Sequence, residues 1–219
     1  DLLGQIALVT AGDKSLVFKG GTALNKVYLG EEQRFSEDLD FDLAGATPQE
    51  AFIYARELSA KITGFEIGEF RRVRQTAMFE CGFLSPLGKK DHVRVDISGK
   101  KITTVNPLVV GGARSTFTDR VVTGFQVYSL DDLVARKFNA LVDRCEGKDV
   151  YDIARSIGQT KQFKKAVAKA LESEGKSVSA SDFIEMGIVK LGSVNAERLM
   201  RLTNPIIPFS KRPRNWQIL

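Results

Sequence analysis

The sequence predicts an α/β (α+β) fold, in which a small mixed sheet is followed by a C-terminal helical region. Two patterns support this. Short alternating or apolar segments dominate as far as about residue 128, whereas apolar residues recur at helical spacing from residue 129 onward. The 219 residues have ordinary globular composition, 43% hydrophobic and 27% charged, and suffice for two such parts. We therefore expect an α/β domain over 1–128 and a helical domain over 129–219.

The elements expected before residue 65 alternate between helix and strand. Each is bounded by turn or capping residues: a Gly-Gly pair ends the first strand, Thr22 can cap the helix after it, and Pro48 opens the last helix. The expected order is a short apolar helix over 1–11, a strand over 15–19, a helix over 23–29, a strand over 38–43 and a helix over 48–62.

Between residues 65 and 98 the pattern changes to the two-residue period of strands, and residues 99–128 are irregular. The alternation is strict over 92–98, so Arg94 and Asp96 lie on the face opposite the apolar side chains that enter the core. The expected strands are 65–67, 76–84 and 92–98, with short strand-like pieces at 108–110 and 125–127.

From Ser129 onward the chain is expected to be helical. A stripe of apolar residues over 130–142 defines the first helix, and Gly147 ends it. We expect Asp149 to cap the next helix, which continues to residue 157. The remaining segments are a helix over 163–171, one or two helices over 181–203, and an extended basic tail after Pro205.

The predicted strand over 38–43 carries alternating carboxylates. Its apolar residues can enter a core on one face, which leaves Asp38, Asp40 and Asp42 together on the other. Three like charges repel, and hard divalent cations prefer carboxylate oxygens as ligands. The pattern therefore indicates a cation site. The alternative is a solvated face of an edge strand, although Asp is depleted in strands.

Charge is distributed unevenly along a chain of net charge +5. The acids of residues 31–50 are Glu31, Glu32, Glu37, Asp38, Asp40, Asp42 and Glu50. The bases of residues 198–219 are Arg198, Arg201, Lys211, Arg212 and Arg214, with no acid among them. An acidic centre beside basic flanks suits a metal site that handles a polyanion, though a charged surface without a ligand has the same appearance.

Lys137 and Asp152 are the two charged residues of interest in the helical half. At 100° per residue Lys137 falls inside an apolar stripe, so it either extends to the rim or points across a cleft toward phosphate oxygens. Asp152 is in the first turn of the helix expected to start at Asp149, where spacing alone favours a capping role over a catalytic one.

Other features limit the location of the protein. No apolar run is long enough to span a bilayer, and no signal peptide is visible. Cys81 and Cys145 lack both disulfide-framework and metal-ligand spacing. We expect a cytoplasmic protein. Because the first residue is Asp1 rather than methionine, the natural chain is expected to begin upstream.

Four segments in order resemble one family. They are Phe-Lys-Gly-Gly-Thr-Ala-Leu at 18–24, Arg-Phe-Ser-Glu-Asp-Leu-Asp-Phe at 34–41, Ala-Arg-Lys-Phe-Asn-Ala-Leu at 135–141 and Lys-Asp-Val-Tyr-Asp at 148–152. Together they resemble the AbiEii / MenT family, nucleotidyltransferase-like toxins of bacterial and archaeal toxin–antitoxin systems. The first two segments are specific in combination, and the other two are looser. The resemblance ends near residue 160.

The resemblance implies a polymerase-β-type nucleotidyltransferase core, with the helical domain completing the active-site cleft. Asp38 and Asp40 would hold Mg²⁺, with Mn²⁺ as the alternative ion, and Asp96 is the candidate for a third carboxylate. Asp42 would lie outside the site. The implied catalytic residues are Asp38, Asp40, Lys137 and Asp152. The implied nucleotide-binding residues are Lys19, Gly20, Gly21, Thr22, Arg34, Ser36 and Lys137.

The implied function is Mg²⁺-dependent transfer of nucleotides from an NTP to the 3′ end of tRNA, which releases pyrophosphate and inhibits translation. The expected partners are the tRNA acceptor stem and a cognate antitoxin, which acts as a protein or indirectly as a transcriptional repressor. We expect a monomer that does not bind membranes. One alternative is the same chemistry on a protein or an aminoglycoside-like small molecule. The other is a non-catalytic RNA-binding module.

Overall fold

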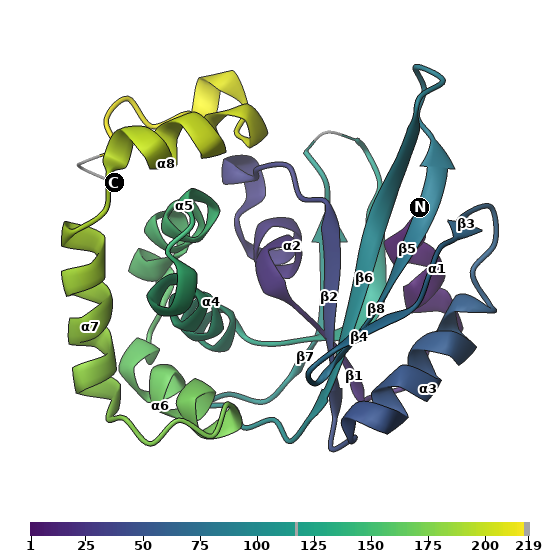
Figure 1. The fold of residues 1–219 in the computed structure, drawn as a ribbon, viewed down its shortest axis with the longest axis horizontal. Helices are drawn as coiled ribbons and strands as arrows, with labels where there is room; N and C mark the ends of the chain where they lie inside the picture. The colour runs from purple at the N-terminus through teal and green to yellow at the C-terminus, as the bar shows by residue number, and fades with distance from the viewer. Residues whose placement is uncertain (117, 217–219) are drawn as a thin grey trace.

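A mixed sheet stands beside a group of helices, with the helix that follows the first strand between them (Figure 1). This computed structural model describes residues 1–116 and 118–216, so the last three residues of the predicted helical domain lie outside the described part. The predicted α/β (α+β) class is confirmed.

The sheet has eight strands in the described residues. Their order is β3-β5-β6-β2-β1-β8-β7, and β4 pairs with β5 off this path. The strands are β1 (Leu16–Lys19), β2 (Asp38–Ala44), β3 (Glu66–Ile67), β4 (Arg71–Val73), β5 (Thr76–Leu84), β6 (Lys90–Lys100), β7 (Val109–Arg114) and β8 (Val121–Val127).

Strand β2 lies at the centre of the sheet, antiparallel to β1 and parallel to β6. Leu39, Phe41 and Leu43 are buried, which confirms the predicted apolar face. A central strand is shielded on both edges, so its aspartates do not form the solvated face of an edge strand. The sheet therefore carries a row of carboxylates toward the helical half of the molecule.

The α-helices lie on the two sides of the sheet. Helices α1 and α3 cover the side turned away from the other helices (Figure 1). The helices are α1 (Leu2–Val9), α2 (Gly20–Ala23), α3 (Pro48–Ser59), α4 (Leu130–Arg144), α5 (Gly147–Ser156), α6 (Phe163–Ser173), α7 (Ala180–Gly192) and α8 (Ala196–Thr203).

Buried apolar residues form two clusters. One contains the sheet side chains and extends to Val134 near the start of α4, and the other runs from Ala135 to Trp216. Helix α4 thus contributes to both. We propose that the chain divides into an α/β domain over 1–128 and a helical domain over 129–219.

Three local expectations were wrong. Thr22 lies inside α2 rather than capping it, and its hydroxyl donates to the backbone carbonyl of Asp38. Helix α5 is capped by Glu146, which makes Asp149 its third residue. The tail after Pro205 is not extended throughout: it forms two 3₁₀ turns, and Ile207 and Trp216 are buried.

In the described residues, none of the helices combines the length and the apolar character needed to cross a membrane.

Gly99 on β6 tests the packing of α3 against the sheet. A Cβ atom there would overlap the backbone carbonyl of Thr47, which caps α3, whereas one at Gly112 on β7 would make only ordinary contact. We expect Gly99→Ala to lower the free energy of unfolding by about 2 kcal/mol. Chemical denaturation measures this value, and Gly112→Ala is the control. Equal stability of the two variants would show that this packing is not tight.

Candidate functional site

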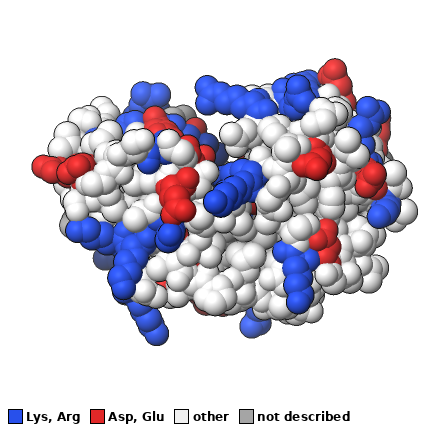
Figure 2. Space-filling view, turned by 90° about the horizontal axis from the view of Figure 1, so that it is seen from below, with Lys and Arg blue, Asp and Glu red and all other residues white. Residues whose placement is uncertain are grey.

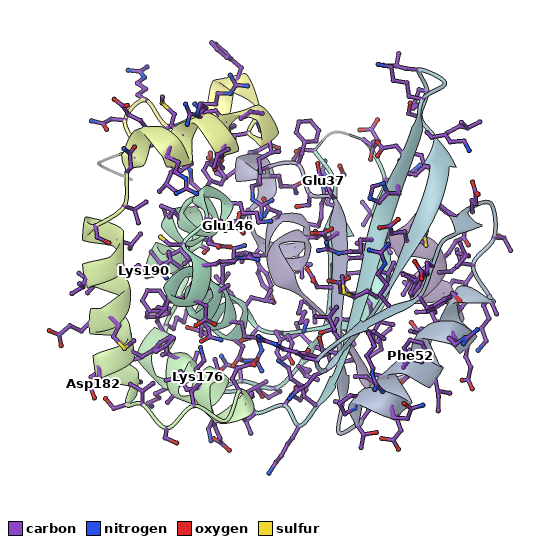
Figure 3. All side chains as sticks on the ribbon, in the orientation of Figure 1. Glu37, Phe52, Glu146, Lys176, Asp182 and Lys190 are labelled. Atoms are coloured by element: carbon purple, nitrogen blue, oxygen red, sulfur yellow. The ribbon has the colours of Figure 1, made fainter. Side chains whose placement is uncertain are left out.

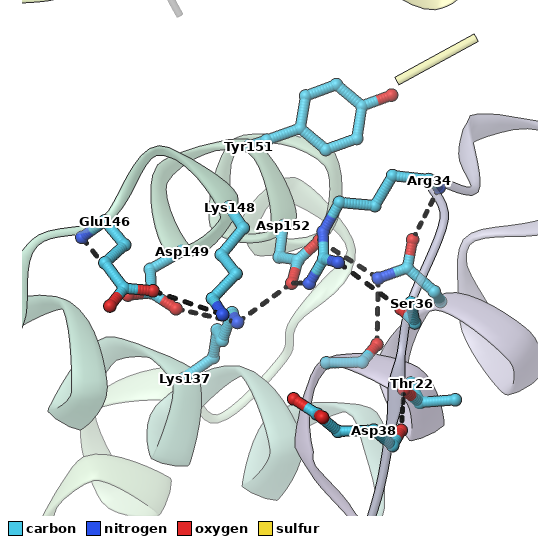
Figure 4. Close-up of polar contacts among 12 residues, drawn as sticks. Thr22, Arg34, Ser36, Asp38, Lys137, Glu146, Lys148, Asp149, Tyr151 and Asp152 are labelled. Atoms are coloured by element: carbon cyan, nitrogen blue, oxygen red, sulfur yellow. Dashed lines mark hydrogen bonds and ion pairs between the residues drawn. The ribbon is translucent and has the colours of Figure 1, made fainter. Parts of the chain in front are cut away.

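Ten of the eleven predicted site residues line one cleft of about 370 Å³. The sheet side supplies the loop from β1 into α2, the segment leading into β2, the first half of β2 and the second part of β6, from Arg94 to Lys100. The helical side supplies α4, the start of α5 and the end of α6. Figure 3 labels one residue on each side of the site, Glu37 ahead of β2 and Glu146 ahead of α5. Asp152, the eleventh residue, is fully buried behind the cleft. Figure 4 shows the polar contacts that surround it.

Two carboxylates face each other across neighbouring strands. Asp40 on β2 is the register partner of Asp96 on β6, and Asp38 lies two residues before Asp40. Burial raises the pKa of Asp96 to about 6, and the charge of Asp40 adds to this. Burial also raises the pKa of Asp40, despite the nearby charge of Lys19. These carboxylates therefore lack sufficient positive charge.

Arg94 partly compensates for this deficit. Its guanidinium lies 3.0 Å from Asp38 Oδ2 and 3.0 Å from Asp96 Oδ1, and so bridges two of the three predicted metal ligands. As the side chains stand, no three His, Cys, Asp or Glu residues in the described chain are arranged to hold a metal ion. The donor set itself suits a hard divalent cation, because it consists of carboxylate oxygens, and burial raises the pKa values of Asp40 and Asp96. Binding such an ion requires the guanidinium of Arg94 to move.

Asp152 is held by a dense set of donors (Figure 4). Arg34 binds it through Nε at 2.8 Å and Nη2 at 2.6 Å, and Asn25 donates to it at 3.0 Å. Lys137 Nζ lies 3.0 Å from its Oδ2. Burial alone would raise the pKa of Asp152, but the charges of Lys137 and Arg34 outweigh it and lower the pKa. Asp152 is therefore ionised, and it lies beyond the first turn of α5, so the capping interpretation is wrong.

Lys137 does not extend to the rim of the protein. It is 7% exposed, and its Nζ bridges Asp152 and Asp149, with 2.7 Å to Asp149 Oδ1. Lys137 was predicted from the sequence as a site residue, whereas Asp149 was predicted only as a helix cap. Arg144 also binds Asp149, through two nitrogens at 3.0 Å each. Residues 148–152 thus supply two buried carboxylates that position one lysine at the cleft.

The two glycines before α2 allow the backbone to approach both clusters. Gly20 has a positive φ of 76°, and a Cβ atom there would overlap the carboxylate of Asp40. At Gly21 a Cβ atom would lie 2.5 Å from Arg34 Nη2. Both are among the first residues of α2, where backbone N–H groups are available to an anion. Among the other predicted site residues, Ser36 accepts a long hydrogen bond from Arg34 at 3.3 Å.

Asp42 lies outside the cleft lining, in accord with the sequence-based expectation. It is fully buried and accepts hydrogen bonds from Lys19 and from the Tyr128 hydroxyl, at 2.5 and 2.6 Å. The charges of Lys19 and Lys100 overcome the effect of burial and lower the pKa of Asp42. The hydrogen bond to Asp42 positions Lys19, a predicted nucleotide-binding residue, at the edge of the cleft.

Comparison with known proteins identifies the family. A sequence profile of the AbiEii nucleotidyl transferase toxins of type IV toxin–antitoxin systems matches residues 1–217. The chain belongs to the AbiEii family. A search of curated protein sequences finds no match.

Solved structures show the same architecture. MenT4, a nucleotidyltransferase toxin from Mycobacterium tuberculosis, aligns with a TM-score of 0.62 at 20% identity, over 90% of this chain and 70% of that one. At this identity the match shows the fold. An antigenic nucleotidyltransferase-like protein from Paracoccidioides brasiliensis aligns with a TM-score of 0.40 at 14% identity, over 84% and 92% of the two chains. That score is too low to support an argument.

The buried Asp149 predicts a pH-dependent contribution to stability in this AbiEii protein. Burial opposes its ionisation, but hydrogen bonds from Arg144 and the charge of Lys137 lower its pKa from 3.8 to about 2. A depressed folded-state pKa stabilises the protein at pH values above the unfolded value, and this contribution is lost as the pH falls toward 2. We expect Asp149→Asn to cost about 2 kcal/mol at pH 7 and about half of that at pH 3.

The free energy of urea unfolding at both pH values measures this difference. The control is Asp182→Asn, which changes an aspartate at the same position of α7 whose side chain accepts a hydrogen bond from the capping Ser179. A cost for Asp149→Asn that is the same at pH 3 as at pH 7 would contradict an ionic origin.

Proposed function

We propose that this AbiEii toxin transfers nucleotides from an NTP to the 3′ end of tRNA in a reaction that requires Mg²⁺ or Mn²⁺, and thereby inhibits translation. The observation that supports this most directly is the cleft itself. One wall carries carboxylates whose burial is not fully offset by neighbouring cations. The other wall carries Lys137, which buried carboxylates orient. A metal–triphosphate substrate matches both walls.

In the proposed reaction, the 3′ hydroxyl oxygen forms a bond to the α-phosphorus while the bond to the β-phosphate oxygen breaks, and pyrophosphate leaves. Negative charge increases on the phosphoryl oxygens during this step. When bound, a divalent ion held by Asp38 and Asp40, with Asp96, would neutralise that charge and polarise the α-phosphate. The residues of the chain itself bind and orient the substrate.

The cations of the cleft have different roles in this proposal. Lys137 lies at the cleft surface and can donate to phosphate oxygens. Arg34 is 4% exposed and forms an ion pair with Asp152, so we propose that it positions Asp152. The backbone N–H groups of Gly20 and Gly21 approach the triphosphate from the start of α2.

The acceptor and the partners follow from the same reasoning. A tRNA end is a polyanion, and the cations that line the cleft suit its phosphates. Because aminoacylated and free tRNA both occur in the cytoplasm, we propose that the reaction takes place there. A toxin also implies a cognate antitoxin that limits its activity, and we propose that the toxin acts as a monomer.

Label transfer tests the reaction class. With tRNA, Mg²⁺ and NTP labelled at the α-phosphate, we expect label in RNA from the wild type and a loss of about 10³-fold in Asp40→Asn, because the site then lacks a central carboxylate. Asp91→Asn, an exposed aspartate on the same strand as Asp96, is the control. Label that enters RNA only from the γ-phosphate would indicate a kinase. Label in protein or in an aminoglycoside, with none in RNA, would show that the acceptor is a protein or a small molecule instead of tRNA.

Metal binding tests the role of Arg94 without depending on turnover. The Arg94 guanidinium competes with a cation for Asp38 and Asp96, so we expect Arg94→Met to bind Mn²⁺ about fivefold more tightly in calorimetry, the effect of about 1 kcal/mol for a partly exposed ion pair. Arg71→Met removes an exposed ion pair with Glu69 and is the control. Weaker Mn²⁺ binding by Arg94→Met would mean that Arg94 preorganises the carboxylates.

A further inference from the structure

A continuous groove leads away from the cleft over the C-terminal helices. The cleft shares Arg144, Lys148 and Ile206 with an adjoining hollow of about 810 Å³ between the start of α5 and α8. That hollow shares Asn195 and Arg198 with a third, of about 640 Å³, on the outer side of α8. We name the second and third hollows together the α5–α8 groove.

The α5–α8 groove is strongly basic. Its acidic lining residues are Glu146 and Glu197. Its basic lining residues are Arg144, Lys148, Lys190, Arg198, Arg201 and Arg212. Arg144, Lys148 and Lys190 already bind carboxylates or backbone carbonyls of the chain. A potential of one sign along a groove attracts a polyanion.

Arg198 and Arg201 are available for such a ligand. Both are exposed, and the described residues include no carboxylate or hydrogen-bond acceptor in contact with either guanidinium. They lie three residues apart on α8, so their side chains project from neighbouring positions on one side of the helix. Within the described residues neither guanidinium is therefore used in an ion pair.

The other mouth of the cleft differs in charge. There the cleft shares Lys100 and Glu174 with a hollow whose remaining charged residues are Lys101 and Glu172. Its charges therefore balance, and Lys100 and Glu174 already pair with each other. Figure 2 shows the molecule from below Figure 1, where blue and red side chains lie together around a central hollow. Of these two ends, as the described residues form them, the α5–α8 end favours a polyanion.

We propose that the α5–α8 groove binds the unpaired 3′ end of the RNA acceptor and leads its terminal hydroxyl into the cleft. This inference rests on the proposed function. The strand is unpaired because a duplex is too wide for a cleft of about 370 Å³, and the reacting hydroxyl must reach the carboxylates inside it. No aromatic side chain lines the groove in the described residues, so binding acts on phosphates rather than by base stacking.

The test compares Arg198→Ala/Arg201→Ala with Lys164→Ala/Lys165→Ala, a pair of exposed lysines on α6 outside the groove. For RNA with a single-stranded 3′ overhang, we expect the arginine variant to raise KM for RNA about tenfold and to reduce the salt dependence of binding by about 1.4 in log–log slope. Its kcat and KM for NTP should stay unchanged. A blunt-ended duplex should show little difference between the two variants.

The outcomes separate this inference from the proposed function. If the wild type labels no RNA at all, the proposed function fails, and fluorescence anisotropy with a single-stranded oligonucleotide still tests the groove. If the wild type is active but both variants have the same KM for RNA and the same salt slope, the groove proposal is overturned. It is also overturned if the arginine variant keeps its RNA affinity and loses only inhibition by an acidic protein.

Discussion

The buried contact of Asp152 with Arg34 and Lys137 is the interaction on which the arrangement of this molecule depends. Arg34 comes from the segment before β2, Lys137 from α4 and Asp152 from α5, so one carboxylate joins the sheet half to the helical half. A fully buried carboxylate without partners would carry a large desolvation penalty. The two cations and the Asn25 amide remove most of it. The two walls of the cleft are thereby fixed relative to each other by a polar contact rather than by apolar packing alone.

Asn25 extends this contact into the backbone. Its amide nitrogen also donates to the Gly21 carbonyl, and its amide oxygen accepts from the backbone N–H of Arg34. The glycine turn, the segment before β2 and helix α5 are thus joined through one side chain. Asn25 lies in the π-helical turn that follows α2, a local geometry that often occurs at functional sites. A binding loop for phosphate held in this way is ordered before a nucleotide arrives, which reduces the entropic cost of binding.

Periodicity alone predicted most of the architecture around the cleft. The bounds of β5 match the prediction, and the alternation of β2 and β6 placed Asp40 and Asp96 on one face of the sheet. It predicted β7 and β8 less well, because glycines interrupt their alternation and a bulge at Gly111 and Gly112 shifts the register.

The partners of the charged residues were harder to predict. The helical wheel of α5 showed one apolar face and left Asp152 outside it, although Asp152 is fully buried. A wheel describes one helix and does not reveal that its second face packs against a segment more than a hundred residues away. The ligands of Lys137 and the bridging position of Arg94 depend on such long-range packing, as does the folded tail after Pro205.

The two polar clusters differ in their electrostatic state, and this difference defines what the cleft can bind. Around Asp152 the cations outweigh burial and the pKa falls, so this cluster is complete without a ligand. Around Asp96 burial and a neighbouring carboxylate outweigh Arg94 and the pKa rises, so this cluster destabilises the fold at neutral pH when it is ionised. An added cation relieves that cost. A ligand that brings a divalent ion to the carboxylates and places phosphates beside Lys137 therefore fits the charges of both walls.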